Sequence, residues 1–295
     1  MKRLISLGLI LVLLMVLFAG CQTEEKKVVI ASKPHSEQYI LAEMLTQLIE
    51  SHTDIMVEQK LGIGGGTANI HPAVLAGEID IYPEYSGTGW LFVLKEDLIN
   101  DPDELYMAVT DQYKADFDIV WLDRYGFNNT YALAVSGPIA EEFQLETYTD
   151  LVDKSPMLVF GAEYDFYERE DGYPGLEAVY GFDFKEKKEL DIGLKYEAIG
   201  SGEIDVVNAF STDGLLKQYD LKVLADDQNF FPSYQAATLI RQETLDKYPE
   251  LKDVLNKLAG QISDDEMIEL NYMVEKENQD PKEVAKKFLE EKGMI

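Results

Sequence analysis

The stretch Gly77-Glu-Ile-Asp-Ile-Tyr-Pro-Glu-Tyr-Ser-Gly-Thr-Gly-Trp90 returns in altered form as Gly202-Glu-Ile-Asp-Val-Val-Asn-Ala-Phe-Ser-Thr-Asp-Gly214. Each copy predicts a short buried strand, Ile79 to Tyr82 in the first copy, that runs into a tight turn. In both copies an aromatic residue stands eight positions after the first glycine, Tyr85 in one and Phe210 in the other. The repeat therefore predicts two similar lobes that each offer an aromatic side chain to a small molecule held between them.

Strand and helix signals alternate on both sides of this stretch, as expected of an α/β protein with a largely parallel sheet. Ser36 is expected to cap the first helix, because apolar residues follow it at helical spacing. The expected helices cover 36–49, 68–76, 103–117 and 174–180, and the chain is expected to be helical from 241 to its end. The further expected strands cover 28–31, 55–61, 119–121, 157–160 and 221–224.

Two segments rich in strand-forming residues, 127–135 and 234–240, are expected to cross between the lobes. They divide the chain into a first lobe of 28–128 and 237–295 and a second lobe of 129–236. Ligands of open α/β sheets lie beyond the carboxyl ends of the strands. Four aromatic residues stand near such ends or crossings, and we expect them to converge: Tyr85, Tyr131, Phe210 and Tyr234.

The N-terminal residues 1–20 have the layout of a secretory signal peptide, with a basic start and an apolar run over 4–19. A single-pass anchor is the alternative, but the run is short for a bilayer. Cys21, the single cysteine of the chain, is expected to be the lipidated residue of a lipoprotein, although leucine is usual where Phe18 stands. With one cysteine, neither a disulfide nor a thiolate metal cluster is expected. Residues 21–27 then form a lipidated tether.

The net charge of −29 argues against nucleic acid as a partner, because phosphate contacts require a basic face. Such a charge keeps a protein soluble on an exposed cell surface, and it also attracts cationic ligands. Both interpretations stay open at this point.

Signals for catalysis or for a bound metal are weak. The glycine loop over 62–67 lacks the Gly-Lys-Ser/Thr of a P-loop, so a helix-entry turn is the better interpretation. His35, His52 and His71 have no metal-ligand spacing and are expected in structural or surface roles. The sequence contains no serine elbow and no distinctive acid pair. We therefore expect neither an enzyme nor a cofactor or metal.

The four aromatic residues together favour a quaternary ammonium ligand, although each alone is more often part of a core. A quaternary ammonium ion cannot donate a hydrogen bond, and each aromatic face around it contributes roughly 0.5–2 kcal/mol when water is excluded. Lys33, Thr88 and Arg169 would meet a carboxylate on the same ligand, Arg169 through its planar fork. The alternative for Lys33 and Arg169 is a surface salt bridge.

Six motifs, in this order, are shared with a known family: Ser32-Lys-Pro-His-Ser-Glu-Gln-Tyr39, Gly64-Gly-Gly-Thr67, Gly77-Glu-Ile-Asp-Ile-Tyr-Pro-Glu-Tyr-Ser-Gly-Thr88, Gly126-Phe-Asn-Asn-Thr-Tyr-Ala-Leu133, Glu168-Arg-Glu-Asp-Gly-Tyr-Pro-Gly-Leu176 and the Gly202–Gly214 repeat. With them the chain resembles the substrate-binding lipoproteins of osmoprotectant ABC transporters, which take up glycine betaine, carnitine, choline and related compounds. The resemblance covers nearly all of the chain after the signal peptide. It implies an α/β fold of the two-lobed periplasmic-binding-protein type (type II-like), with two crossing hinge strands.

By motif, the family's cage of four tyrosines falls on Tyr85, Tyr131, Phe210 and Tyr234. The phenylalanine keeps the cation–π face of the tyrosine it replaces and loses the hydroxyl. Positions that contact the ligand's polar end fall on Lys33, Thr88 and Arg169, with Asn129 as a further ligand-binding residue. Two cations and a hydroxyl favour a carboxylated ligand, such as glycine betaine, proline betaine or carnitine, with choline kept open.

The resemblance implies capture without chemistry. A ligand that bridges the lobes favours closure, and the closed form docks on a membrane permease driven by an ATPase. Acyl chains on Cys21 would hold the protein, expected to be a monomer, at the extracytoplasmic face of the bacterial cell membrane. Three alternatives stay open: a binding protein for an amino acid or polyamine, a secreted acidic hydrolase, and a sensor or germination-type receptor of the same fold.

Overall fold

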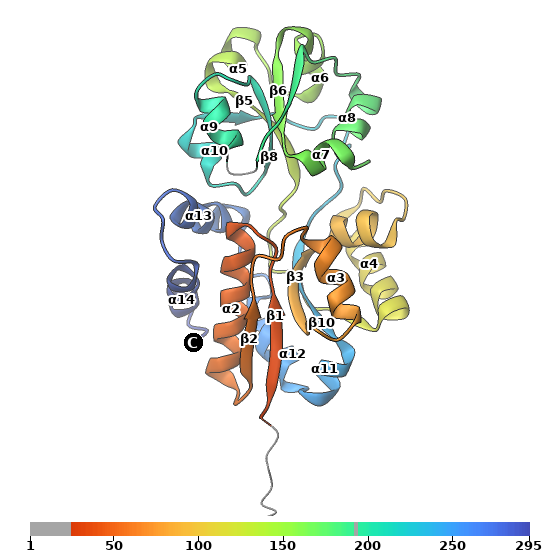
Figure 1. Ribbon diagram of the computed structural model, residues 1–295, viewed down its shortest axis with the longest axis vertical. Coiled ribbons are helices and arrows are strands. Elements are labelled where there is room, and N and C mark those ends of the chain that lie inside the picture. Colours follow the sequence, from red (N-terminus) through yellow and green to blue (C-terminus); the bar gives the residue numbers. More distant parts are fainter. Residues whose placement is uncertain (1–24, 192–193) are drawn as a thin grey trace, which may run out of the picture.

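The computed structural model describes residues 25–191 and 194–295. The predicted signal peptide, Cys21 and most of the predicted tether lie outside these described residues. The chain forms two lobes, one above the other in Figure 1, and each is built on a five-stranded sheet. The predicted α/β class with two lobes is confirmed. Within the described part of the chain, no helix is both long and apolar enough to span a membrane.

The first-lobe sheet has the strand order β2-β1-β3-β10-β4. Strand β1 pairs in parallel with β2 and β3, whereas β10 returns from the second lobe and lies antiparallel between β3 and β4. The strands are β1 Lys27–Ala31, β2 Met56–Lys60, β3 Ile81–Tyr85, β4 Ile119–Trp121 and β10 Ala236–Arg241. The helices are α2 Ser36–His52, α3 Thr67–Leu75, the π-helix η1 Thr88–Leu94, α4 Pro102–Phe117, α11 Gln242–Lys247, α12 Glu250–Leu255, the 3-10 helix η3 Asn256–Leu258, α13 Asp264–Glu275 and α14 Pro281–Glu291.

The second-lobe sheet has the order β7-β6-β8-β5-β9, with β6 parallel to β7 and β8, and β5 antiparallel to β8 and β9. The strands are β5 Tyr131–Ser136, β6 Val159–Ala162, β7 Glu186–Glu189, β8 Val206–Phe210 and β9 Leu221–Val223. The helices are α5 Gly137–Phe143, α6 Tyr148–Val152, the 3-10 helix η2 Ser155–Met157, α7 Tyr164–Glu168, α8 Tyr173–Tyr180, α9 Lys195–Gly200 and α10 Leu215–Gln218.

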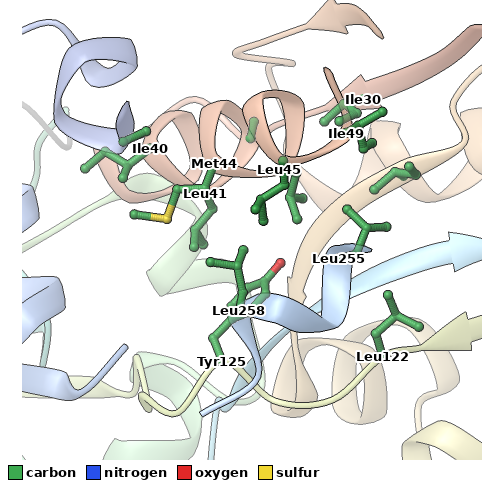
Figure 2. Close-up of a cluster of buried hydrophobic side chains, with 14 of the residues drawn as sticks. Ile30, Ile40, Leu41, Met44, Leu45, Ile49, Leu122, Tyr125, Leu255 and Leu258 are labelled. Atoms are coloured by element: carbon green, nitrogen blue, oxygen red, sulfur yellow. The ribbon is translucent and has the colours of Figure 1, made fainter. Parts of the chain in front are cut away.

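Helix α2 carries much of the first-lobe core, and its residues 40–46 are all buried. Figure 2 shows Leu41 and Leu45 pointing from this helix toward Leu258 and Leu255. These side chains are almost completely buried, and each contributes roughly 1.5–3 kcal/mol through burial. The core thereby fixes the start of α2, where Glu37 lies, against the first lobe.

The repeated Gly-Glu-Ile-Asp unit has the same structural role in both lobes. Gly77 and Gly202 follow α3 and α9 with φ of 76° and 75°, a conformation that glycine adopts without strain. The Asp80 amide donates to the Val29 carbonyl of β1 (2.9 Å), and the Asp80 carboxylate accepts from the Val29 amide (2.8 Å). Asp205 makes the same two bonds to a residue of β6, both 2.8 Å long. The unit therefore fastens the chain to the neighbouring parallel strand just before β3 and β8 begin.

Strands β3 and β8 consequently end on the two repeated aromatic residues, Tyr85 and Phe210. The prediction that the first strand stops at Tyr82 was wrong. The antiparallel partner β10 pairs along β3 as far as Tyr85, opposite Ala236, and this pairing continues the strand through Pro83.

The start of α2 also differs from the prediction. His35, with φ of −148° and ψ of 160°, is the N-cap, and Ser36 is already helical. The Ser36 side chain acts on Glu275 of α13, where it opposes the rise of the Glu275 pKa.

The chain passes between the lobes twice, and the two crossings are joined to each other. The Asn129 amide donates to the Tyr234 carbonyl (3.1 Å), and the Asn128 side-chain oxygen accepts from the Tyr234 amide (2.7 Å). The segment expected to be a strand over 127–135 is therefore a strand only from Tyr131 onward. Both crossings place an aromatic residue at the boundary between the lobes.

Candidate ligand-binding site

Three of the four predicted cage residues lie in direct contact at the lobe boundary. The Tyr131 ring centroid is 5.0 Å from that of Phe210 and 5.7 Å from that of Tyr234, at interplanar angles of 35° and 89°. Strand pairing explains this placement, because Tyr131 and Phe210 face each other at the ends of β5 and β8. Rings at these distances and angles form adjacent walls of one aromatic surface.

Tyr85 of the first lobe joins this group through His35. The His35 ring centroid is 6.5 Å from that of Tyr85 and 6.5 Å from that of Phe210, and the imidazole is nearly parallel to both rings (20° and 10°). Tyr85 and Phe210 are therefore nearly parallel to each other. His35 was expected in a structural or surface role, so sequence reasoning missed it, although it lies within one of the six shared motifs.

The imidazole of His35 is neutral at physiological pH. Burial, and then the nearby ammonium groups of Lys33 and Lys195, lower the pKa of His35 to about 3. A neutral ring at this position does not repel a cationic ligand, whereas a protonated one would.

A buried lysine stands over each of the two parallel rings. Lys33 Nζ is 4.6 Å from the Tyr85 centroid, and Lys195 Nζ is 5.0 Å from the Phe210 centroid. Lys195 is completely buried and pairs with Glu163 at 2.5 Å. Since an unpaired buried ammonium is very costly, these ion pairs fix where each lysine stands behind its ring.

Lys33 was predicted to meet the carboxylate of a ligand. Its ammonium bonds Glu84, which is fully buried and also accepts hydrogen bonds from the Thr67 hydroxyl (2.7 Å) and the Tyr85 amide (2.8 Å). Burial lowers the pKa of Lys33, and Glu84 opposes this effect. A ligand carboxylate would therefore have to share Lys33 with Glu84.

Arg169 lies beside the aromatic group and is held in a side-on pair with Asp171. Its Nε and Nη2 donate to the two Asp171 oxygens at 2.7 and 2.5 Å, and its guanidinium lies 5.9 Å from the Tyr131 centroid. Burial lowers the pKa of Arg169, but Tyr131 and Asp171 raise it further, so the net shift is upward and the charge is permanent. Because Asp171 engages only Nε and Nη2, the N–H groups of Nη1 are directed elsewhere and fit a second carboxylate. Asp171 also accepts a hydrogen bond from the Tyr234 hydroxyl (2.9 Å).

Glu37, at the start of α2, joins the site to both lobes and was not predicted. One carboxylate oxygen accepts from the Tyr85 hydroxyl (2.5 Å) and from Asn129 Nδ2 (2.8 Å). The other accepts from the Thr212 hydroxyl (2.7 Å) and from Asn271 Nδ2 (3.2 Å). Burial raises the pKa of Glu37, and the four donors oppose that rise but leave the net shift upward. No sequence spacing indicated this cluster, because its members are drawn from five distant segments.

The remaining predicted residues also lie at the boundary. Thr88 is buried at the start of η1, directly after Gly87, where an added Cβ would stand 2.8 Å from the Tyr234 ring. Asn129 is buried, and its Oδ1 has no hydrogen-bond partner among the residues that the structure describes. Two surface hollows lie apart from this site, one of about 550 Å³ lined by residues 51–54 and one of about 590 Å³ beside α5.

Residues 26–291 match a family of known function, the substrate-binding domain of ABC-type glycine betaine transport systems (OpuAC). The chain belongs to this family. It is a substrate-binding protein of an ABC transport system, as the motifs indicated, and members of the family are transport proteins. The two-lobed fold of periplasmic substrate-binding proteins is confirmed, because a crystal structure described as a glycine betaine/carnitine/choline ABC transporter superposes with a TM-score of 0.78 at 38% identity, over 90% of this chain and 99% of that one.

Two relatives of the family are informative. The ergothioneine transport permease/ergothioneine binding protein EgtU of Helicobacter pylori is 46% identical over 271 residues, which are 92% of this chain and 48% of that protein. The chain thus spans about half the length of this relative. The carnitine transport binding protein OpuCC of Listeria monocytogenes is 36% identical over 298 residues, 98% of this chain and 96% of that protein.

Proposed function

We propose that this protein captures betaines, small molecules that carry a quaternary ammonium group and a carboxylate, for import by an ABC permease. The observation that carries the proposal is the convergence of Tyr85, Tyr131, Phe210 and Tyr234 from both lobes beside Arg169. Aromatic faces suit an ammonium that cannot donate hydrogen bonds, and a guanidinium fork suits a carboxylate. Lys33, Thr88 and Asn129 complete the proposed set of ligand-binding residues.

Ligand binding would be coupled to closure of the lobes. Tyr85 belongs to the first-lobe sheet, and Tyr131 and Phe210 belong to the second. A ligand held by all three makes contacts that exist only when the lobes are closed, so it shifts the population toward the closed form. The closed form is then the one that a permease recognises, and the chain itself performs no chemistry.

The names of the family and of its relatives point to one chemical class of ligand. Glycine betaine, carnitine and ergothioneine all carry a trimethylammonium group and a carboxylate. The relative at 46% identity is named for ergothioneine and the relative at 36% for carnitine. All three belong in the first ligand panel, with proline betaine, and choline tests whether the carboxylate is required.

The cellular setting is part of the proposal. We place a diacylglycerol-modified Cys21 after removal of residues 1–20, and this lipid would hold a monomeric protein at the outer face of the cell membrane. Tethering keeps the protein near its permease and raises the effective concentration for docking.

Calorimetric titration of the purified protein with this panel tests the proposal. We expect saturable binding of at least one betaine, weaker binding of choline, and none of histidine or spermidine. Tyr131→Ala should weaken betaine binding about tenfold, the equivalent of 1.4 kcal/mol. Phe143→Ala, on α5 at the far end of the second lobe (Figure 1), should leave it unchanged. The proposal is wrong if the protein binds no betaine. It is also wrong if Tyr131→Ala and Phe143→Ala change betaine binding equally.

A further inference from the structure

Two tyrosines of the proposed cage donate their hydroxyls to carboxylates behind them. Tyr85 donates to Glu37 Oε1 at 2.5 Å, and Tyr234 donates to Asp171 Oδ2 at 2.9 Å. We propose that Glu37 and Asp171 are positioning residues that make the cage prefer a cation over a neutral group of the same shape. This inference rests on the proposed function and adds a second layer of residues to it.

The Glu37 side chain has the surroundings of an ionised carboxylate. It accepts four hydrogen bonds, two on each oxygen, and two of the donors are amide groups of Asn129 and Asn271 that can only donate. A proton on either oxygen would have to displace one of these donors. All four donors are neutral, so none of them cancels the negative charge.

A charged acceptor behind a phenol acts on the ring in two ways. It polarises the O–H bond, which makes the ring face more negative and strengthens its attraction for a cation. It also holds the ring in one orientation, because Tyr85 in addition accepts a hydrogen bond from Gln38 (3.1 Å). The first effect distinguishes a cation from a neutral group, whereas the second helps both equally.

Polarisation matters here because cations already stand beside the rings. The ammonium of Lys33 lies 4.6 Å from the Tyr85 centroid, and its pair with Glu84 reduces but does not remove its repulsion of a second positive charge there. Glu37 offsets this repulsion. Phe210 faces Lys195 in the same way but has no hydroxyl to polarise.

The two carboxylates should differ in how strongly they make the cage prefer a cation. Asp171 is already paired with the guanidinium of Arg169 through both oxygens, which neutralises much of its charge. Its main effect is to connect Tyr234, at the ammonium end of the ligand, with Arg169, at the carboxylate end. We therefore expect the larger effect on cation preference from Glu37.

A pair of isosteric ligands tests the inference. Glycine betaine and the anion of tert-butylacetic acid have the same shape, and carbon replaces the ammonium nitrogen in the second. The ratio of their dissociation constants, measured by calorimetry at neutral pH, reports cation preference alone. We expect Glu37→Gln to reduce this ratio about tenfold and Asp171→Asn about threefold, whereas Glu50→Gln, at an exposed position of the same helix, should leave it unchanged.

Tyr85→Phe keeps the ring and removes the hydroxyl, and with it the bond donated to Glu37 and the bond accepted from Gln38. It covers the case in which Glu37→Gln does not fold. It should also lower the ratio. If Glu37→Gln or Tyr85→Phe weakens both ligands equally, the carboxylate only supports the structure and the inference is wrong. A parent protein that shows no preference for glycine betaine overturns the proposed function and this inference together.

Discussion

The Thr212 hydroxyl, after β8 in the second lobe, donates to Glu37 Oε2 at the start of α2, 2.7 Å away. The same segment meets α13, where Asn271 Nδ2 donates to the Thr212 carbonyl (2.9 Å). Gly214 packs so closely on the Tyr272 backbone that an added Cβ would stand 2.5 Å from its nitrogen. These contacts hold the two lobes together beside the proposed cage. They are separate from the contacts that Tyr131 and Phe210 make.

Replacing Thr212 by valine should weaken this closure. The variant removes one donor to a buried carboxylate, which costs about 1–3 kcal/mol in the closed form. We expect betaine affinity to fall about tenfold with no change in the rank of ligands, together with a larger radius of gyration in solution scattering.

Thr212→Ser keeps the hydroxyl and serves as the control. Because valine keeps the methyl group, a valine variant that binds as tightly as the parent, beside a serine variant that has lost affinity, would show that methyl packing and not the hydrogen bond holds the lobes together.

Arg169→Lys should weaken binding of the carboxylate end of the ligand and leave binding of its ammonium end largely unchanged. Lysine keeps the positive charge but loses the planar fork, so it cannot bind Asp171 side-on and present a second pair of N–H groups. We expect about tenfold weaker binding of carboxylated ligands such as glycine betaine, and a much smaller change for choline, which has no carboxylate. Equal losses for both ligands, measured by calorimetry, would mean that Arg169 supports the cage and does not contact the carboxylate.

Lys33→Met should destabilise the fold. The substitution leaves the fully buried Glu84 without its cation, and breaking a buried pair from one side costs about 3–5 kcal/mol. Denaturant unfolding should show this loss, and the double variant with Glu84→Gln should recover most of it. The exposed pair of Lys26 and Asp54 offers a control, because Lys26→Met should not change the unfolding midpoint measurably. A Lys33→Met protein as stable as the parent would show that the pair with Glu84 does not stabilise the fold.

The fold was largely predictable because its signals are local. Alternating apolar runs and the repeated Gly-Glu-Ile-Asp unit indicate strands through residues that are close together in the sequence. The end of β3 was misplaced because it depends on β10, which lies about 150 residues further along the chain. The aromatic residues could be predicted from their place at strand ends and in motifs.

The polar part of the site could not be predicted in the same way. Glu37 gathers donors from residues 85, 129, 212 and 271, and no spacing in the sequence connects these positions. Lys33 was predicted as a cation open to ligand, because sequence does not show that Glu84 lies beside it. A neutral His35 likewise depends on burial and on two lysines from different lobes. The partners and charge states of ionisable residues between the lobes therefore could not be predicted from the sequence, because they depend on residues that only the fold brings together.

Glu275 provides a prediction about pH. Burial, then the negative charges of Asp213 and Glu37, raise the pKa of Glu275 to about 8, against an ordinary value of 4.5. The folded protein therefore keeps a proton that the unfolded chain releases near pH 4.5. Since the unfolded state binds fewer protons across this window, the contribution of Glu275 to stability falls as pH rises from 4.5 and stops falling above about 8.

Glu275→Gln mimics the protonated form at every pH and removes this dependence. The free energy of unfolding of the variant minus that of the parent should therefore rise between pH 5 and pH 8, because the parent loses stability that the variant keeps. Denaturant unfolding at several pH values measures this difference, with Glu277→Gln at a neighbouring exposed position as the control. A difference that stays constant across the window would show that Glu275 ionises normally in the folded protein, and that the interface between α13 and the second lobe admits water around its carboxylate.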